Sequence, residues 1–383
     1  MKNCFEKIFN HAPQMSFFSP GRINLIGEHI DYNGGLVFPC AITIGTYALI
    51  SKRDDSKVYA YSMNFEELGT IEFDLSNLDY DKHHNWCNYI KGVAKFLHEE
   101  NNSINTGFNV VINGNIPNGS GLSSSASLEL LCIEIFKALN NLEISSVDAA
   151  KLGKKVENQY IGVNSGIMDQ FAISLGKKDN ALLLNCETLD FEYFPLSLPQ
   201  HKIVIMNTNK RRELADSKYN ERRAECESAL EKLQTKLEVK NLCEVKLTDL
   251  EAHKELLTDI EFIRARHVIS ENVRVKDASE CFSNNDLEQF GKLLNASHKS
   301  LCEDYEVTGI ELDTLVNSAQ QEEGVIGARM TGAGFGGCSL AIVQNESVDR
   351  FIENVSKKYL DIIGYEASFH IAEVGDGPKQ IEL

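Results

Sequence analysis

The pattern of apolar and polar positions predicts a strand-rich beginning and a more helical remainder. Between residues 16 and 75, β-branched and aromatic runs at 36–50 and 57–61 are separated by Gly and Asp clusters, which is typical of strands joined by turns. Helical spacing of apolar residues takes over from residue 86. The expected helices are 86–100, 122–139, 145–160, 212–238, 256–276 and 286–298, and the expected strands are 108–112, 181–185, 202–207 and 338–343.

Chain length and two prolines predict how these elements divide. A chain of 383 residues fits two or three packed units. Pro195 and Pro199 interrupt the pattern just before the strand 202–207, so we expect a boundary between residues 190 and 200. The helix 122–139 is apolar almost all the way round, which is typical of a buried helix.

The charge balance argues against nucleic acids and membranes as partners. The chain has 38 Lys plus Arg against 56 Asp plus Glu, a net charge of −18 that repels phosphate-rich surfaces. No apolar run approaches the roughly 18 residues of a membrane span, and residues 1–14 lack the regions of a secretory signal. Ten scattered cysteines without a Cys-x-x-Cys pair favour free thiols, no structural zinc and a cytoplasmic location.

The segment 117–126, with the sequence PNGSGLSSSA, is a candidate phosphate-binding loop. It joins an expected strand to the buried helix, so free backbone N–H groups converge at a helix N-terminus, which suits an anion. Glycines allow close approach of the backbone, and a hydroxyl such as that of Ser125 could coordinate Mg²⁺. The alternative is a Ser-capped helix after a tight turn.

Several known nucleotide-binding patterns are absent. The chain has no Walker A loop and neither the Asp-Phe-Gly nor the His-Arg-Asp signature of protein kinases. The segment 332–337 has the spacing Gly-x-Gly-x-x-Gly, but it leads into a strand near the C-terminus, which argues against a dinucleotide site. That segment alone could equally be a turn that permits close backbone packing.

Charged residues gather in two further places. Arg22, Glu28, His29 and Asp31 lie within twelve apolar and glycine-rich positions, and this set could hydrogen-bond the vicinal hydroxyls of a sugar or form a surface hairpin. Lys210, Arg211, Arg212, Arg222 and Arg223 form a basic cluster, which we interpret as a solvated helix face balanced by neighbouring glutamates.

Two carboxylates stand among apolar neighbours. Glu157 shares a predicted helix face with Ala150 and Gly153, and Asp169 lies within the segment GIMDQF. An unpaired charge in such surroundings is costly, so each carboxylate needs a cation or an interior ion-pair partner.

Three segments, in order, resemble the GHMP small-molecule kinases, and in particular their galactose-phosphorylating members. The segments are 21–32 (GRINLIGEHIDY), the loop 117–126 and 329–337 (RMTGAGFGG), with further similarity in 86–92, 166–171 and 216–219. The resemblance implies a two-lobed α+β fold. It comprises an N-terminal lobe at 1–195, arranged like ribosomal protein S5 domain 2, and a ferredoxin-like lobe at 196–383, with the active site between them. It also implies transfer of the γ-phosphoryl group of ATP to the anomeric O1 of D-galactose, the first committed step of galactose catabolism.

The same resemblance implies a role for each matching residue. Asp169 would be the catalytic carboxylate beside O1, and Arg22 would face both Asp169 and the migrating phosphoryl group. Sugar contacts fall on Glu28, His29, Asp31, Gly166 and Tyr219. Nucleotide contacts fall on Ser62, Trp86, Gly119, Ser120, Gly121, Leu122, Ser123, Ser124 and Ser125, and the Mg²⁺ ligands on Ser125 and Glu157.

Other members of the same class remain open. A kinase for N-acetylgalactosamine or L-arabinose looks similar around these segments, and some relatives bind galactose and ATP only as sensors that dock a regulatory partner. Arg22, Glu157 and Asp169 together favour chemistry, because a sensor does not need all three. We expect galactose and MgATP as ligands and a monomer or weak homo-oligomer.

Overall fold

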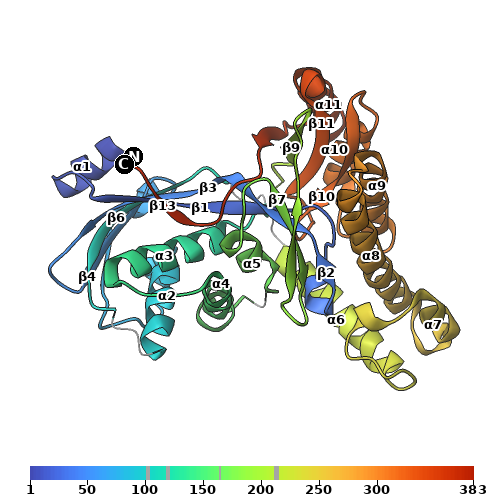
Figure 1. The fold of residues 1–383 in the computed structure, drawn as a ribbon, viewed down its shortest axis with the longest axis horizontal. Coiled ribbons are helices and arrows are strands. Elements are labelled where there is room, and N and C mark those ends of the chain that lie inside the picture. Colours follow the sequence, from blue (N-terminus) through green and yellow to red (C-terminus); the bar gives the residue numbers. More distant parts are fainter. Residues whose placement is uncertain (101–103, 118–120, 164, 211–214) are drawn as a thin grey trace.

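The first lobe is built on a six-stranded sheet. The computed structural model describes residues 1–100, 104–117, 121–163, 165–210 and 215–383 (Figure 1). In spatial order the sheet contains β13 (Lys379–Ile381), β1 (Met15–Asn24), β3 (Pro39–Lys52), β6 (Phe108–Gly114), β4 (Lys57–Ser62) and β5 (Ile71–Asp74). Pairing is antiparallel except between β4 and β6.

Helices cover both faces of this sheet. One face packs against α2 (Cys87–Glu99), α3 (Ser124–Asn140), α4 (Ser146–Lys155) and α5 (Met168–Ser174), which fill a core with Ile50, Val58 and Val110 of the strands (Figure 1). On the opposite face, Phe5 of α1 (Lys2–Phe9) packs on Leu49 and Val111. The prediction that the helix starting at residue 122 is buried is confirmed, since most of α3 is inaccessible to solvent.

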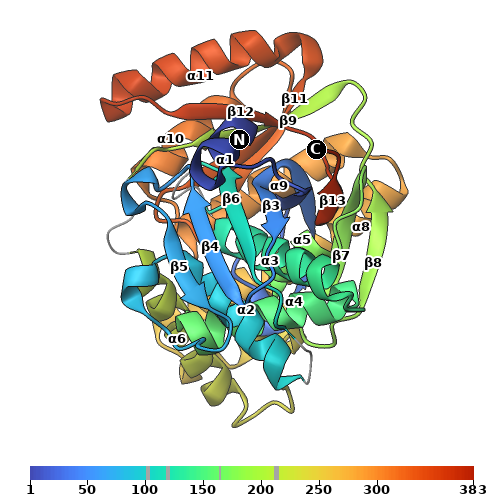
Figure 2. The ribbon, with the colours of Figure 1, turned by 90° about the vertical axis from the view of Figure 1, so that its left-hand side faces the viewer.

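The second lobe contains a four-stranded sheet and most of the remaining helices (Figures 1 and 2). The strand order is β10 (Val325–Thr331), β11 (Cys338–Gln344), β9 (His201–Asn207) and β12 (Ser368–Ala372). One face packs against α10 (Gly309–Gln320) and α11 (Val348–Ile363). On the other side of the sheet, α9 (Leu287–Glu303) contacts β10, and α8 (Asp259–Ser283) runs beside α9. The helices α6 (Ala215–Leu233) and α7 (Leu247–Ala252) pack on α8.

The two lobes share one hydrophobic core. It joins Ile23 of β1 and Leu25, which directly follows β1, to Ile205 of β9, Leu340 of β11 and Phe290 of α9. A small sheet of β2 (Leu36–Val37), β7 (Asn180–Asn185) and β8 (Phe191–Pro195) lies beside β3. The predicted α+β, two-lobed fold is confirmed, and the shared core fixes how the functional segments of the lobes face each other.

The division at residues 195 and 196 stays a proposal. It falls between β8, which ends at Pro195, and β9, which begins at His201. The final strand β13 returns to pair with β1, so the last residues of the chain belong to the sheet of the first lobe. Among the described helices, none is long and apolar enough to span a membrane.

The helix predicted over 145–160 forms, but it changes type on the way. Ser145 caps α4 by accepting a hydrogen bond from the Asp148 backbone N–H. The chain then continues as a π-helix from Val156 to Ile161, in which the Gly162 N–H donates to the Glu157 carbonyl. Such insertions often mark functional sites, because the extra residue rotates the side chains that follow.

Candidate active site

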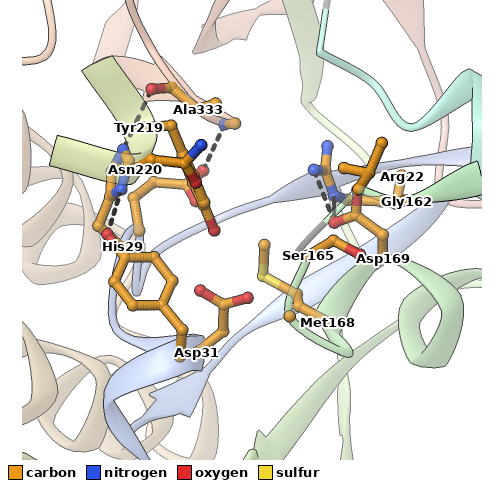
Figure 3. A pocket seen from close by; sticks show the side chains of 15 residues that line it. Arg22, His29, Asp31, Gly162, Ser165, Met168, Asp169, Tyr219, Asn220 and Ala333 are labelled. Atoms are coloured by element: carbon orange, nitrogen blue, oxygen red, sulfur yellow. Dashed lines mark hydrogen bonds and ion pairs between the residues drawn. The ribbon is translucent and has the colours of Figure 1, made fainter. Parts of the chain in front are cut away.

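A cavity of about 400 Å³ opens between the two lobes; we call it the Asp169 cavity (Figure 3). It brings together every residue to which the sequence assigned catalysis or sugar contact: Arg22, Glu28, His29, Asp31, Gly166, Asp169 and Tyr219. Its remaining lining consists of Tyr32, Gly162, Val163, Ser165, Met168, Asn220, Gly332 and Ala333. The alternative of a mixed-charge surface hairpin for residues 20–32 is therefore wrong.

Local backbone geometry places side chains of residues 22–31 in the wall of this cavity. Arg22 lies on β1 opposite Ala41 of β3, next to a register shift in the pairing. Gly27 then adopts φ +102°, and a side chain there would lie 2.8 Å from the Leu36 carbonyl oxygen, so only glycine fits. The turn that follows places His29 and Asp31 in the cavity wall.

Arg22 and Asp169 form the central ion pair. The guanidinium Nε and Nη2 lie 2.9 and 2.7 Å from Asp169 Oδ1, and Nη1 donates to the Gly121 carbonyl at 2.7 Å. Burial disfavours the charged guanidinium, but Asp169 and Glu28 outweigh it and raise the pKa of Arg22. One arginine thus connects the cavity carboxylate to the candidate phosphate loop.

Ser123 holds the other oxygen of Asp169. Its hydroxyl donates to Asp169 Oδ2 instead of capping α3, although Ser123 occupies the N-cap position. Its backbone is left-handed, with φ +64°, which is uncommon for serine and is often found at functional sites. The alternative of a simple Ser-capped helix therefore fails, because the hydroxyl points to the cavity carboxylate.

Asp31 lies against the loop that precedes α5. A methyl group on Gly166 would fall 1.9 Å from Asp31 Oδ2, so the loop approaches this carboxylate as closely as glycine allows. Burial, together with the negative charges of Asp169 and Glu28, raises the pKa of Asp31 to about 6. The cavity therefore contains a carboxylate whose charge is costly until hydrogen-bond donors reach it.

Glu28 and His29 are already engaged by the protein. Glu28 accepts hydrogen bonds from the Gly332 N–H at 2.7 Å and the Asn24 side-chain amide at 3.0 Å, and it lies 3.7 Å from Arg329. These contacts connect the segment 24–28 to Arg329 and to the glycine motif at 332–337.

His29 makes the same connection through its ring. Nε2 lies 3.1 Å from the Ala333 carbonyl, so it carries the proton, and Nδ1 accepts from the Tyr32 hydroxyl at 2.8 Å. Burial, with the positive field of neighbouring groups, lowers the pKa of His29 to about 3, so the ring is neutral. The Tyr219 ring packs on the rings of His29 and Tyr32, with 5.6 and 5.3 Å between ring centroids. Burial raises the pKa of Tyr219.

A second cavity, of about 440 Å³, lies beside α2 and α3; we call it the Trp86 cavity. It brings together four residues predicted to contact nucleotide, namely Ser62, Trp86, Ser124 and Ser125. Trp86 Nε1 is buried without a hydrogen-bond partner among the described residues. The sequence did not identify the rest of its lining: Thr46, Asn64, Phe65, Tyr80, Lys82, Asn85, Tyr89, Ile112, Gly114, Ile116, Leu128 and Ile161.

Glu157 connects the two cavities. Its Oε1 accepts from Ser125 of the Trp86 cavity at 2.9 Å, and Oε2 accepts from Ser165 of the Asp169 cavity at 2.9 Å. Burial and the charge of Asp169 raise the pKa of Glu157. The predicted grouping of Ser125 with Glu157 is thus seen in the structure, while the role of the pair as Mg²⁺ ligands stays a prediction.

The other predicted loop residues have mixed placements. The Gly121 carbonyl accepts a hydrogen bond from the Arg22 side chain. The Leu122 side chain is fully buried in the shared core, and the Leu122 carbonyl accepts from the Arg22 backbone N–H at 3.3 Å. Gly119 and Ser120 lie outside the described residues.

Adjacency in sequence could have revealed part of what was missed. Tyr32, Ser165, Met168 and Asn220 each neighbour a predicted site residue in the chain. Asn85 of the Trp86 cavity likewise precedes Trp86, whereas Lys82 carries no such signal, because it lies in a connecting segment without a motif.

A candidate phosphate loop that contacts a carboxylate–arginine pair between two α+β lobes points to a GHMP-type small-molecule kinase. Family models agree: the GHMP kinases N terminal domain matches residues 88–177, the GHMP kinases C terminal domain matches 278–361, and the galactokinase galactose-binding signature matches 3–52. The chain belongs to the galactokinase family and is an ATP-dependent sugar kinase.

Similar proteins cover the chain from end to end. A galactokinase of Clostridium perfringens is 59% identical over 100% of this chain and 99% of its own length. The crystal structure of Lactococcus lactis galactokinase complexed with galactose matches with a TM-score of 0.96 and 49% identity, over 99% of this chain and 98% of that one. Methanococcus jannaschii mevalonate kinase shares the fold, with a TM-score of 0.67 and 21% identity over 94% and 98% of the two chains.

Proposed function

We propose that this chain transfers the γ-phosphoryl group of ATP to the anomeric O1 of D-galactose, yielding galactose 1-phosphate and ADP. The observation that carries the proposal is the Arg22–Asp169 pair, which lies in one cavity and contacts the loop leading to the other. Supporting it, the chain belongs to the galactokinase family, and the Lactococcus lactis relative has galactose bound. The proposed reaction forms the O1–Pγ bond, breaks the bond from Pγ to the β-phosphate oxygen and releases ADP.

Asp169 is assigned the proton of O1. Its Oδ1 is occupied by the two Arg22 contacts, so Oδ2, which accepts the Ser123 hydroxyl, is the oxygen that a sugar hydroxyl can approach. The carboxylate either takes the proton as transfer proceeds or orients the hydroxyl while the proton leaves. The transition state of phosphoryl transfer is loose, so catalysis depends mainly on positioning and on charge stabilisation. The positive charge of Arg22 is assigned to stabilising the migrating phosphoryl group.

The residues assigned to magnesium fit that ion. Mg²⁺ prefers oxygen ligands and is commonly held by one or two carboxylates together with substrate phosphates. The Ser125 hydroxyl oxygen and Glu157 Oε1 lie 2.9 Å apart. Burial raises the pKa of Glu157, and a nearby cation would stabilise its charged form. No cluster of three or more His, Cys, Asp or Glu that could hold a metal occurs among the described residues, so phosphate and water oxygens would complete the shell. When bound, the ion neutralises charge on the phosphates.

The sugar and nucleotide contacts follow the two cavities. We assign galactose to Asp31, Tyr219, the Gly166 backbone and the Glu28–His29 turn, whose polar groups converge on the Asp169 cavity. The nucleotide is assigned to Ser62, Trp86, Ser124 and Ser125 in the Trp86 cavity, with its phosphates along the loop at 119–123.

A sugar panel tests the proposal. The chain is incubated with MgATP and D-galactose, N-acetylgalactosamine or L-arabinose, ADP release is measured, and the product is examined by ³¹P NMR for an anomeric phosphate. Galactose should give the highest kcat/KM. A clear preference for either other sugar overturns the substrate assignment, and galactose binding by calorimetry without ADP release identifies a sensor.

Two properties are proposed beyond the reaction. A cytoplasmic location is supported by ten cysteines that are all free. The monomer or weak homo-oligomer stays a prediction, which light scattering after size-exclusion chromatography tests.

A further inference from the structure

The Glu157 carboxylate is held by more than the loop serine. Its Oε2 accepts two hydrogen bonds, from Ser165 at 2.9 Å and from the Gln170 amide at 2.7 Å. Only Oε1 remains at Ser125, on the side of the Trp86 cavity. Of these three donors, Gln170 lines neither cavity and has no part in the proposed reaction.

Gln170 is itself anchored from behind. The same Nε2 donates to Glu129 Oε2 at 3.1 Å, so its two hydrogens connect a carboxyl of α3 to a carboxyl of the π-helix. Both Gln170 and Glu129 are fully buried. Burial, followed by the charge of Glu157, raises the pKa of Glu129.

The backbone of α4 packs closely against this bridge at Gly153. A methyl group on Gly153 of α4 would lie 3.0 Å from Gln170 Cγ and 3.2 Å from Glu129 Oε2. Oε1 of each of the two side chains is buried without a partner in the described part of the chain. A buried polar bridge with unsatisfied atoms is costly for stability alone, which favours a functional reason for it.

We propose that Gln170 and Glu129 are positioning residues for Glu157, which fix its Oε2 so that Oε1 stays beside Ser125. The inference rests on the proposed function, because it takes Glu157 as the Mg²⁺ ligand. Gln170 directly follows Asp169 in the first turn of α5, so one helical turn fixes both the carboxylate of the sugar side and the carboxylate of the metal side.

The expected effect is on metal affinity. Residues that orient a metal ligand from behind change metal affinity by about 10- to 100-fold when they are removed. Gln170→Met and Glu129→Met remove the bridge with little change in shape. Glu129→Gln keeps an oxygen that can accept from Gln170, so it should rescue the function of Glu129→Met.

Binding is measured without turnover. Trp86 is the only tryptophan and lines the nucleotide cavity, so its fluorescence follows binding of a non-hydrolysable ATP analogue at a series of MgCl₂ concentrations, without sugar. In Gln170→Met and Glu129→Met, the Mg²⁺ concentration for half-maximal binding should rise about tenfold or more, while in Glu129→Gln it should stay within about threefold of the parent. Nucleotide affinity in EDTA and galactose affinity by calorimetry should change less than about twofold.

Reference variants separate the possible failures. If Glu157→Gln raises the Mg²⁺ midpoint but Gln170→Met and Glu129→Met do not, the positioning role is wrong and the metal site stands. If Glu157→Gln also leaves the midpoint unchanged, the metal assignment fails and the inference fails with it. A purely structural role would weaken all three binding measurements together. Should the Met variants not fold, Gln170→Asn, which is one methylene too short to bridge both carboxyls, gives the same test.

Discussion

Arg22 binds Asp169 through two nitrogens that share one oxygen, at 2.9 and 2.7 Å from Oδ1, and this leaves Oδ2 for the serine hydroxyl and the substrate. The same guanidinium donates to the Gly121 carbonyl. A planar group with several fixed donors can make all three contacts at once, whereas a lysine ammonium acts as a single point charge. Arg22 therefore sets the position of the carboxylate relative to the candidate phosphate loop.

Arg22→Lys should lower kcat about a hundredfold, because misplacing a reacting group by about 1 Å costs that much. Steady-state kinetics with galactose and MgATP measure the change. Arg53→Lys is a matched control, since Arg53 forms a comparable two-nitrogen pair with Asp55 on the surface, at 2.8 and 2.6 Å, and should leave kcat unchanged. Equal kcat in Arg22→Lys and the parent would contradict the positioning role of Arg22.

Asp169→Asn should leave galactose affinity largely intact but reduce kcat about a hundredfold or more, because the amide accepts the Arg22 hydrogen bonds but not a proton. Calorimetry gives the affinity and ADP release gives the turnover. Near-normal turnover would remove Asp169 from the mechanism, and a parallel loss of affinity would show that its role is binding.

The sequence predicted those parts of the fold that follow from local patterns. The apolar run at 122–139 predicted a buried helix, and the helical spacing at 145–160 predicted α4, because these signals lie within a few turns of the chain. The π-helix at 156–161 and the return of β13 to the first sheet left no such local signal. Both depend on packing between segments far apart in the chain.

The site was predictable where a motif carries the chemistry. Arg222 shows the limit: its charged neighbours suggested a solvated helix face, but it is buried and donates to the Tyr305 carbonyl at 2.7 Å. Gln170 shows it too, since no property of its sequence position indicates two carboxyls 13 and 41 residues away. Side-chain partners of buried polar groups are decided by tertiary packing, which a periodic pattern does not encode.

Ser123→Gly should separate activity from stability. Glycine accepts the left-handed backbone without strain but has no hydroxyl to hold Asp169 Oδ2, so kcat should fall about tenfold, while the melting temperature stays equal or rises. Asn141→Gly is the matched control, because Asn141 is left-handed at the other end of α3. It should resemble Ser123→Gly in melting and the parent in kcat; unchanged turnover in Ser123→Gly would show that its hydroxyl does not support Asp169.

Gly166→Ala should weaken galactose binding, about tenfold or more, because the added methyl group would occupy space 1.9 Å from Asp31 Oδ2 and push this carboxylate from its place. Calorimetric titration with galactose measures the loss. In Gly114→Ala the new methyl group would have only ordinary contacts at 3.7 Å and beyond, so galactose affinity should be unchanged. Equal affinity in Gly166→Ala and Gly114→Ala would mean that Asp31 does not need this close approach.

Asp31→Asn should stabilise the protein at neutral pH, because the Asp31 charge is costly in the fold. Its pKa is about 6 in the folded chain, through burial and the charges of Asp169 and Glu28, against about 4 when unfolded. The folded state therefore holds the proton more tightly, and the cost of the charge grows as pH rises from about 4 to 6 and is constant above.

Melting temperatures of Asp31→Asn and the parent should coincide near pH 4 and differ by a few degrees, about 2–4 °C for each kcal/mol, at pH 7.5. A difference independent of pH would show that Asp31 does not titrate in this range. Saturating galactose should narrow the gap at pH 7.5, because sugar hydroxyls then donate to the Asp31 carboxylate.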